Sequence, residues 1–585
     1  MIQKKNLSLA AFILMAGILI LNAMGERNYW GDSSEIRHAL VARSLADGRG
    51  LASTFEEEYA AGTYPLVPLA ISIPFLLADD ADEVLSRIPS AISAFAALFV
   101  TYSIGALLFG RIPAIFAFAV FATSALFSFY AKDASPQMAG ALFLLSSLYC
   151  LARLAQDQER GLWARLYWVS LALLFYTEGP APVVIALAGA WSVARGEVFG
   201  PGVTGRLFGK FNLAMFAGII APWLIFAMAA NGMSLAPRSS GAMTGIKDFI
   251  LLAFLFIPWI FAAPSALLYC AAEKDKPTRL LLSFFTGAVV AAFALSLFGH
   301  THLLGLHGIV ALFIGVYIHS CRKGTDDDAA ENSSHTEKDI WTPAYISNLI
   351  IIFPLFIFTL VIALASFYFF YSYSEKYASF GAGILEAPLS MAASIPIPSF
   401  ATASVLLAAI YISFKSSERF ADSGETLGMW AAAVLSSFAC LLYFHSSLAP
   451  SLNKSFSHRT FYSQISNFIG KGGPIFHFEK ENLQGMFYLG SGSFASVVNS
   501  NNVPALLEVM GKRQAPTFIL TDEAGKESLK NIVAISRYKP IIYMDSYFVP
   551  LTRALGKNRL YLFRYSPLNV NGDIQIIKNL LNKSK

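Results

Sequence analysis

Asp32 and Asp133 are the acidic residues of this chain that are best placed to do chemistry. Each follows a long apolar segment: Asp32 lies within residues 28–35, and Asp133 lies between Tyr130 and Pro136. A carboxylate beside an apolar segment can serve as a general base, because partial loss of water raises its pKa toward the working pH. Each acid also has a simpler interpretation. Asp32 would then be a solvated loop residue or a helix N-cap, and Asp133 would cap a helix that has Pro136 in its first turn.

Other polar residues near the expected outer ends of the apolar segments could bind a substrate. Glu178 stands beside Gly179-Pro180 at the end of one segment, with an exposed turn acid as the alternative. Arg238 and Lys247 could clamp a phosphate or could be ordinary loop charges. The substrate-binding residues predicted from the sequence are Glu35, Tyr64, Lys132, Glu178, Arg238, Lys247, His300 and His302.

Metal and cofactor signals are weak. His300, His302 and His307 are spaced H-x-H-x4-H, but no acid or cysteine accompanies them, so contact with the interface or a phosphate is favoured over zinc. The four cysteines, at 150, 270, 321 and 440, have no paired spacing. No P-loop or dinucleotide fingerprint occurs. We therefore predict no cofactor; a divalent metal stays an alternative that no motif indicates.

The composition is that of a polytopic membrane protein. Of 585 residues, 55% are hydrophobic and only 14% are charged, against about 25% charged in soluble domains. The net charge of +5 is small, and the basic residues lie in short loops. They are interpreted as topology signals, so the expected partner surface is the lipid bilayer and not nucleic acid. The first 24 residues, with Lys4 and Lys5, are expected to be an uncleaved anchor, with a cleaved signal peptide as the alternative.

A helix needs about 20 apolar residues to cross a bilayer. Thirteen candidate spans are predicted at 8–25, 88–109, 113–131, 136–154, 164–181, 182–194, 211–230, 249–271, 280–298, 303–320, 345–370, 398–414 and 428–447. With the N-terminus inside, every loop that falls inside carries Lys or Arg. An odd number of spans then puts the C-terminus outside.

The first outer loop is predicted at 26–87. The apolar stretch 64–77 within it is short and holds three prolines, so a re-entrant or interfacial helix is favoured over a span. Residues 34–46 place Ile36, Leu40, Val41 and Leu45 at helical spacing, which predicts an amphipathic helix lying on the membrane.

From about residue 451 the composition changes to that of a soluble domain. Strands are predicted at 474–478, 517–520, 541–544 and 560–564, and helices at 505–512 and 526–532. This alternation indicates a small α/β domain. The predicted domains are a membrane module at 1–450 and an α/β domain at 451–585.

Several of these motifs resemble the GT-C glycosyltransferases, in particular the bacterial family-39 branch related to aminoarabinose transferases and protein O-mannosyltransferases. The similar segments are 31–35, 42–50, 64–66, Ser86–Ala91 ("SRIPSA"), Asp133 before Pro136, Thr177–Pro180, Pro222-Trp223, Pro258-Trp259 and 300–304. Two departures are that Thr63 and Glu178 stand where family members usually carry lysine.

The resemblance implies a mainly helical, polytopic GT-C bundle of about 13 spans with a small C-terminal extracytoplasmic α/β domain. It also implies transfer of a sugar from a polyprenyl-phosphate donor to a lipid, glycan or protein acceptor at the periplasmic face of a bacterial inner membrane. In that mechanism Asp32 is the general base, and Asp133 orients the acceptor or stabilises charge at the sugar carbon. The alternatives are a catalytically inactive member or a transporter- or flippase-like membrane protein.

Overall fold

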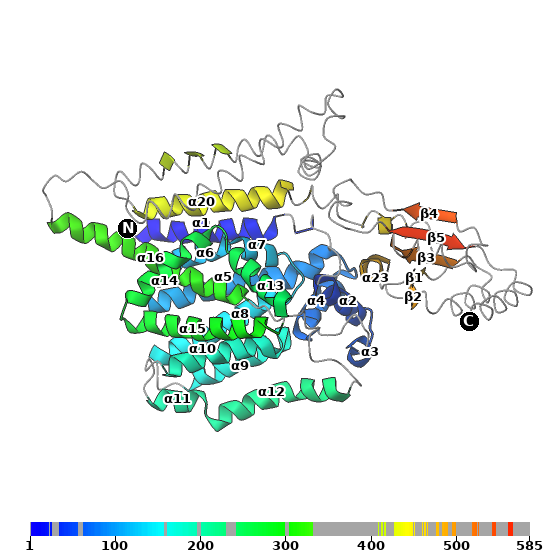
Figure 1. Ribbon diagram of the computed structural model, residues 1–585, viewed down its shortest axis with the longest axis horizontal. Helices are drawn as coiled ribbons and strands as arrows, with labels where there is room; N and C mark the ends of the chain where they lie inside the picture. Colours follow the sequence, from blue (N-terminus) through cyan, green and yellow to red (C-terminus); the bar gives the residue numbers. More distant parts are fainter. Residues whose placement is uncertain are drawn as a thin grey trace, which may run out of the picture.

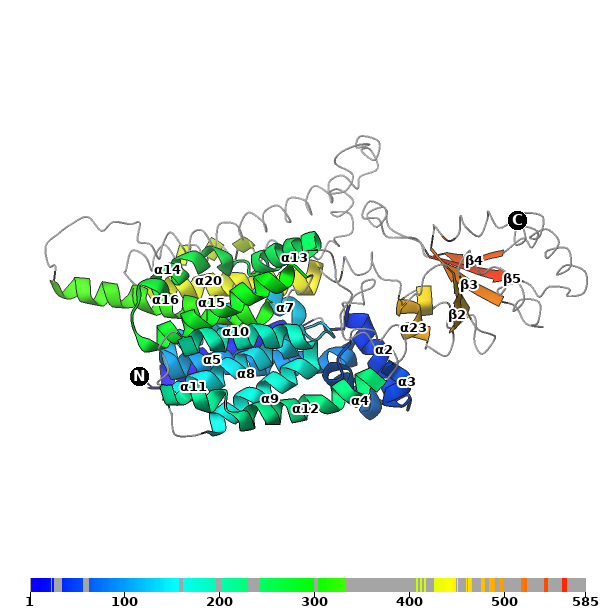
Figure 2. The ribbon, with the colours of Figure 1, turned by 60° about the horizontal axis from the view of Figure 1, so that its bottom comes forward.

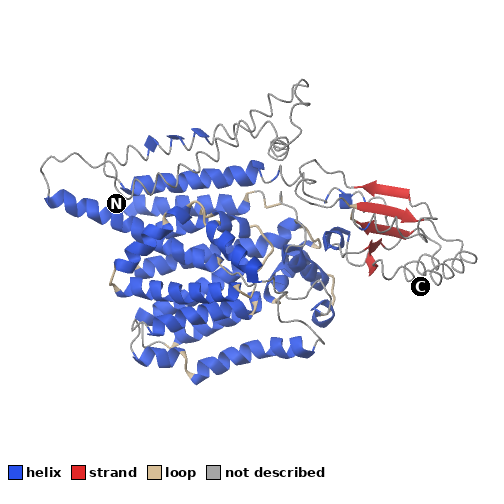
Figure 3. Cartoon of the chain, viewed as in Figure 1, coloured by secondary structure: helices blue, strands red, loops and turns tan. Residues whose placement is uncertain are grey.

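Long helices lie side by side in a bundle, and a small sheet lies beyond one end of it (Figures 1 and 3). The computed structural model describes residues 2–22, 24–25, 34–55, 63–156, 161–195, 201–229, 242–298, 303–331, 407–408, 411–412, 415–416, 426–448 and 450, and, in the C-terminal part, 459, 461–463, 465, 475–478, 483–489, 494–498, 517–522, 525, 541–545 and 560–565.

The helical elements follow the predicted apolar segments closely. In chain order they are α1 (Ile2–Leu21), α2 (Ser34–Ala46), α3 (Leu51–Phe55), α4 (Leu66–Ala78), α5 (Glu83–Leu108), α6 (Arg111–Ala122), α7 (Ala125–Tyr130), α8 (Gln137–Gln156), α9 (Leu162–Glu178), α10 (Pro180–Arg195), α11 (Pro201–Leu207), α12 (Lys210–Ala229), α13 (Ala242–Phe254), η2 (Trp259–Phe261), α14 (Ala263–Ala272), α15 (Lys276–Ser296), α16 (Leu304–Glu331), α20 (Thr426–Tyr443) and the π-helical η3 (Phe444–Leu448).

The chain is a mainly helical, multi-pass membrane protein. Within the described ranges, six helices are long and apolar enough to cross a membrane, or seven if a bent pair counts as one span. The predicted segment 345–370 and most of 398–414 lie outside the described residues. The total of thirteen spans therefore stays a prediction.

Two predicted spans are broken, which corrects the expectation of one helix each. Segment 249–271 becomes α13 and then η2–α14, bent by 94°, and Pro258 at the break has no N–H to continue the helix. Segment 113–131 becomes α6 and α7, and at its break the hydroxyl groups of Thr123 and Ser124 donate back to the Ala119 and Phe121 carbonyls at 2.6 and 3.0 Å.

The two breaks satisfy each other's backbone groups. The first amides of α7, Ala125 and Leu126, donate to the carbonyls of Ile257 and Leu255 at 3.0 and 3.1 Å. The Trp259 indole Nε1 donates to the hydroxyl of Thr123 at 3.1 Å. An unpaired backbone group in an apolar interior costs several kcal/mol, so neither break would be stable without the other.

The predicted outer-loop helices exist, but one lies differently from expectation. Helix α4 is 13 residues long with Pro74 inside it and is too short to count as a span, as predicted. Helix α2 has the predicted bounds, but its polar residues Glu35, His38 and Ser44 are buried along with its apolar ones. Since α4 and α23 pack against α2, protein encloses this helix, which corrects the prediction of an amphipathic helix lying on the membrane.

The C-terminal part holds a five-stranded mixed sheet, drawn at one end of the molecule in Figure 2. Its strands are β1 (Ile475–Phe478), β2 (Phe494–Val498), β3 (Thr517–Thr521), β4 (Ile541–Asp545) and β5 (Tyr561–Tyr565), in the order β2-β1-β3-β5-β4. Strand β1 is parallel to β2 and β3, and β5 is antiparallel to β3 and β4. The four predicted strands are confirmed; β2 and helix α23 (Leu483–Leu489) were missed, and the predicted helices 505–512 and 526–532 lie outside the described residues.

Candidate active site

The loop between α7 and α8 carries Lys132 and Asp133, both almost completely buried, at 2% and 6% exposure. Its backbone is fixed at successive residues. The amides of Lys132 and Asp133 donate to the Phe129 and Tyr130 carbonyls at 3.2 and 3.3 Å, and the Ala134 amide donates to Glu35 Oε1 at 3.1 Å. The predicted acid is thus presented by a rigid turn.

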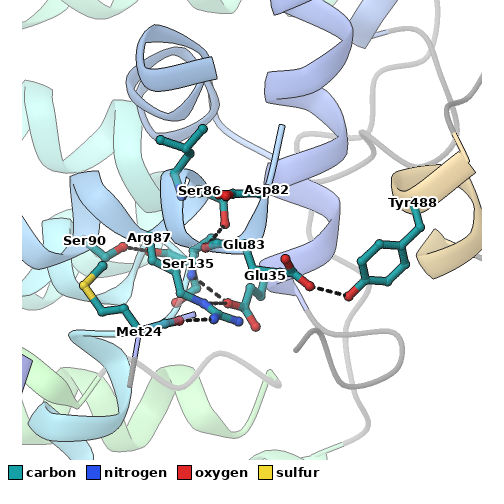
Figure 4. Close-up of polar contacts among 11 residues, drawn as sticks. Met24, Glu35, Asp82, Glu83, Ser86, Arg87, Ser90, Ser135 and Tyr488 are labelled. Atoms are coloured by element: carbon teal, nitrogen blue, oxygen red, sulfur yellow. Dashed lines mark hydrogen bonds and ion pairs between the residues drawn. The ribbon is translucent and has the colours of Figure 1, made fainter. Parts of the chain in front are cut away.

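Glu35 reaches this loop from α2 and holds it against α5. Its Oε1 also accepts from Arg87 Nε at 2.9 Å, and the two side chains are 1% and 0% exposed. Arg87 Nη1 donates in turn to the carbonyl of Met24 at 2.5 Å. Figure 4 shows Arg87 lying between Glu35 and Met24. One buried ion pair therefore ties α2, α5, the turn after α1 and the Asp133 loop together.

Asp82 caps the N-terminus of helix α5, which begins at Glu83. Asp82 accepts a hydrogen bond from the Leu85 amide at 2.7 Å and starts the helix at Glu83. The start lies one turn before the predicted span at 88–109, so Arg87 sits inside the helix. The Ser90 hydroxyl donates to the carbonyl of Ser135 at 3.5 Å, which adds a second tie between α5 and the loop.

The predicted residues Tyr64 and Glu178 come together at the end of α9. Tyr64 packs on Gly179, where a Cβ atom would lie 2.2 Å from the ring, and its ring meets Phe175 edge to face at 5.8 Å between centroids. Burial raises the pKa of Tyr64 to about 12, so its hydroxyl stays a donor at neutral pH. Glu178 lies against Gly140 of α8, where a Cβ atom would be 2.1 Å from Oε1.

A small pocket opens beside the Asp133 loop. Its polar lining comes from Tyr130 and Gln137, which flank the loop, and from Glu178. The rest of the lining is mostly aliphatic and includes Leu144, Leu252 and Leu303. Such a mixture of apolar walls and few polar groups is typical of a small-molecule site.

Of the remaining predicted site residues, the structure describes only Lys247. Lys247 is exposed on α13 and is not part of the pocket lining, although Leu252 of the same helix is. Asp32, Arg238, His300 and His302 lie outside the described residues. Within the described ranges, no three His, Cys, Asp or Glu side chains gather in a way that could hold a metal ion.

Several residues of this region were missed by the sequence reasoning. In the sequence Arg87 is simply one residue of the SRIPSA segment. A guanidinium in an apolar stretch requires a buried partner, however, and that signal could have linked it to Glu35. Gln137 carried no such signal. Neither did His445, whose Nε2 lies 2.7 Å from the Ser128 hydroxyl across 317 residues of sequence.

Comparison with known proteins identifies the architecture. Residues 63–198 match the family model described as dolichyl-phosphate-mannose-protein mannosyltransferase. The crystal structure of ArnT from Cupriavidus metallidurans in the apo state matches with a TM-score of 0.66 at 15% sequence identity, over 95% of this chain and 97% of that one. The chain has the ArnT fold. ArnT bound to undecaprenyl phosphate matches with a TM-score of 0.64 at 14% identity and the same coverage.

The match of residues 63–198 to the family model agrees with the family resemblance that the motifs indicated, and the likeness to ArnT shows the fold. Among curated protein sequences, none matches the chain. The family model begins at Thr63, one residue before Tyr64, and continues through the Asp133 loop to the end of α10. It therefore covers Arg87, Asp133 and Glu178. The helices that carry these residues belong to the part of the chain that has the ArnT fold.

Proposed function

We propose that this chain is a membrane glycosyltransferase that moves a sugar from a polyprenyl-phosphate donor to a hydroxyl or amine of an acceptor. The observation that carries the proposal is the buried acid Asp133, held in a turn whose flanking residues Tyr130 and Gln137 line a mostly apolar pocket. The ArnT fold supports it, because one ArnT structure contains undecaprenyl phosphate. The sugar and the acceptor are not encoded in any motif.

The proposed reaction is a displacement at the anomeric carbon of the sugar. The acceptor oxygen or nitrogen attacks that carbon, the bond from carbon to the phosphate oxygen breaks, and polyprenyl phosphate leaves with the electron pair. Asp32, three residues before Glu35 in the sequence, is the proposed base that takes the acceptor proton. Asp133 is proposed to orient the acceptor or to stabilise the positive charge that develops on the sugar carbon.

The remaining predicted residues have proposed roles that follow from their surroundings. Lys132 supplies a cation next to Asp133, and such a cation would stabilise the phosphate leaving group. Glu178, a carboxylate in the pocket lining, suits sugar hydroxyls better than a phosphate. Arg238, Lys247, His300 and His302 are the further candidates for the phosphate charge. Glu35 is already bonded to Arg87 and Ala134, so we assign it a positioning role.

We place the site on the outer face of a bacterial inner membrane. The N-terminal end of α1 and the C-terminal sheet lie at opposite ends of the bundle (Figure 1). If the basic N-terminus is cytoplasmic, the sheet and the Asp133 loop are then periplasmic. We also propose that residues 1–450 form the membrane module and 451–585 the periplasmic domain. A reporter fused after residue 450 should be active only outside the cytoplasm, and cytoplasmic activity would contradict this topology.

The test of the enzyme assignment is a transfer assay on membranes with lipid-linked sugars. Asp32→Asn and Asp133→Asn should each lower transfer by about 100-fold or more, as for loss of a general base or of an electrostatic stabiliser. The control is Asp79→Asn, which changes an exposed acid just after α4 where the left-handed backbone suits asparagine. Normal transfer by both site variants would rule out this mechanism, whereas absence of transfer by the unsubstituted chain would favour an inactive or transport role.

A further inference from the structure

The C-terminal part is joined to the bundle through α23. The Tyr488 hydroxyl donates to Glu83 Oε1 at 2.7 Å, and the guanidinium of Arg459 lies 3.4 Å from Glu83 Oε2. Arg43 of α2 donates to the carbonyl of Phe487, and its guanidinium lies 5.9 Å from the Phe487 ring centroid. Figure 2 shows α23 between the sheet and α2.

Glu83 is the residue on which these contacts converge. It is the first residue of α5, it is 2% exposed, and both of its carboxylate oxygens are engaged by residues from beyond position 450. The bond from Tyr488 spans 405 residues of sequence. An acid in the first turn of a helix is stabilised by the helix dipole, but a buried carboxylate also needs donors. Tyr488 is the more protected of the two donors, since it is partly buried and the Arg459 side chain is 52% exposed.

One turn of α5 connects Glu83 to the candidate active site. The Ser86 hydroxyl donates to the Glu83 carbonyl at 2.8 Å, and Arg87 follows immediately. Arg87 then pairs with Glu35, which accepts from the Ala134 amide beside Asp133. In Figure 4 the contacts run from Tyr488 through Glu83 and the first turn of α5 to Arg87, Glu35 and the Asp133 loop. Every hydrogen bond or ion pair in this sequence of contacts is 3.4 Å or shorter.

We propose that Glu83, held by Tyr488, is a positioning residue for the Asp133 loop, so that the C-terminal part sets the geometry of the site in the membrane module. The first turn of a helix is its least stable part, because its amides lack intrahelical partners. Loss of the Tyr488 donor leaves one buried carboxylate oxygen without its hydrogen bond, and α5 relieves this by loosening its first turn. That movement shifts Arg87, and with it Glu35 and the Ala134 amide.

The catalytic half of this inference rests on the proposed glycosyltransferase function, but its structural half does not. The direct test measures hydrogen exchange of the peptide that spans residues 131–136 in the full-length chain in lipid nanodiscs. Tyr488→Phe removes one hydroxyl and keeps the ring stacked on Tyr462, whose centroid lies 5.6 Å away. Exchange in the loop should become about tenfold faster or more, as expected for the loss of a hydrogen bond to a charged group.

A matched control is available at the other end of the bundle. The Tyr269 hydroxyl donates to Glu273 Oε1 at 2.7 Å, an exposed bond between the same two types of group at the C-terminal end of α14. Tyr269→Phe should leave exchange at residues 131–136 unchanged. Glu83→Gln keeps an acceptor oxygen for Tyr488 and should retain most of the loop protection, whereas Glu83→Ala should lose it. Unchanged exchange in Tyr488→Phe and Glu83→Ala would overturn the proposal.

The transfer assay then separates the two proposals. Tyr488→Phe should lower kcat about tenfold and leave KM for the lipid-linked donor nearly unchanged, since the pocket itself is intact. An equal fall in both the variant and the Tyr269→Phe control would overturn the positioning role. A third outcome is faster loop exchange in Tyr488→Phe together with normal transfer by Asp133→Asn. That result would support the coupling between the C-terminal part and the loop and would refute the proposed role of Asp133 in sugar transfer.

Discussion

Arg87 and Glu35 form an ion pair from which water is almost excluded: Nε lies 2.9 Å from Oε1, and the side chains are 0% and 1% exposed. The two residues are 52 positions apart and belong to α5 and α2. A pair of this kind contributes little net stability when intact, because desolvation of both charges offsets their attraction. The pair instead fixes the position of the Asp133 loop, since the same carboxylate oxygen accepts from the Ala134 amide next to Asp133.

Removal of one partner should therefore be costly. Glu35→Gln should destabilise the chain by about 3–5 kcal/mol, because Arg87 keeps a buried charge without its counter-ion. Thermal unfolding in detergent measures the change. The double variant Glu35→Gln/Arg87→Met has no unpaired buried charge. Its decrease in unfolding free energy should therefore be well below the sum of the decreases in the two single variants. Additive losses would show that the pair is not coupled.

Gly140 leaves the space that the Glu178 carboxylate occupies. Gly140→Ala places a methyl group 2.1 Å from the present position of Glu178 Oε1, so the carboxylate must move, at a cost of about 1–3 kcal/mol for overpacking. The same substitution in a Glu178→Ala background should cost much less. Gly218→Ala on α12, where a Cβ atom meets nothing within 4 Å, is the control. Equal costs in both backgrounds would contradict the contact.

Gly179 and Gly110 form a matched pair that separates backbone strain from steric contact. Their φ values are +84° and +91°, and their ψ values are −157° and −179°. Residues with a side chain rarely adopt this backbone conformation. At Gly110 a Cβ atom meets nothing within 4 Å, whereas at Gly179 it would overlap the Tyr64 ring. Gly110→Ala should cost about 1–3 kcal/mol from strain alone.

Gly179→Ala should cost more and should also move Tyr64 away from the end of α9. Thermal unfolding measures the cost, and the fluorescence of the buried aromatic cluster or a crystal structure reports the displacement of Tyr64. If Gly179→Ala and Gly110→Ala lose the same stability, Tyr64 does not pack on Gly179 as described.

The C-terminal sheet should lose stability in mild acid. Burial lowers the pKa of His477 on β1 to about 4, against about 6.5 in the unfolded chain. The folded state thus favours neutral histidine, so this contribution is fully present above about pH 6.5. It is lost as the pH falls toward 4, by up to about 3 kcal/mol.

Pulse proteolysis of the full-length chain between pH 7.5 and pH 4.5 tests this expectation, with the C-terminal fragments as the readout. His477→Leu has no titratable group at that position, so its C-terminal part should lose less resistance to protease over the same interval. An identical pH dependence in both proteins would assign the acid sensitivity to other groups.

The sequence by itself determined the features that depend on local composition. Transfer of apolar segments into lipid is a sum over neighbouring residues, so the long helices fall where the hydrophobic runs are. Proline content and length identified α4 as something other than a span. Residue types with strand preference located β1, β3, β4 and β5, and the apolar segments on either side of Asp133 placed it in a short turn.

Tertiary structure decided everything that depends on partners distant in the sequence. Hydrophobicity could not show that segments 113–131 and 249–271 break, because each break is stable only when the other supplies its missing hydrogen-bond partners. It could not show that α2 is buried, since that requires Arg87 to neutralise Glu35. Tertiary packing likewise determines three contacts: Glu178 with Gly140, Tyr64 with Gly179, and Tyr488 with Glu83. The sequence shows that a carboxylate is present, but only the folded chain determines which group lies next to it.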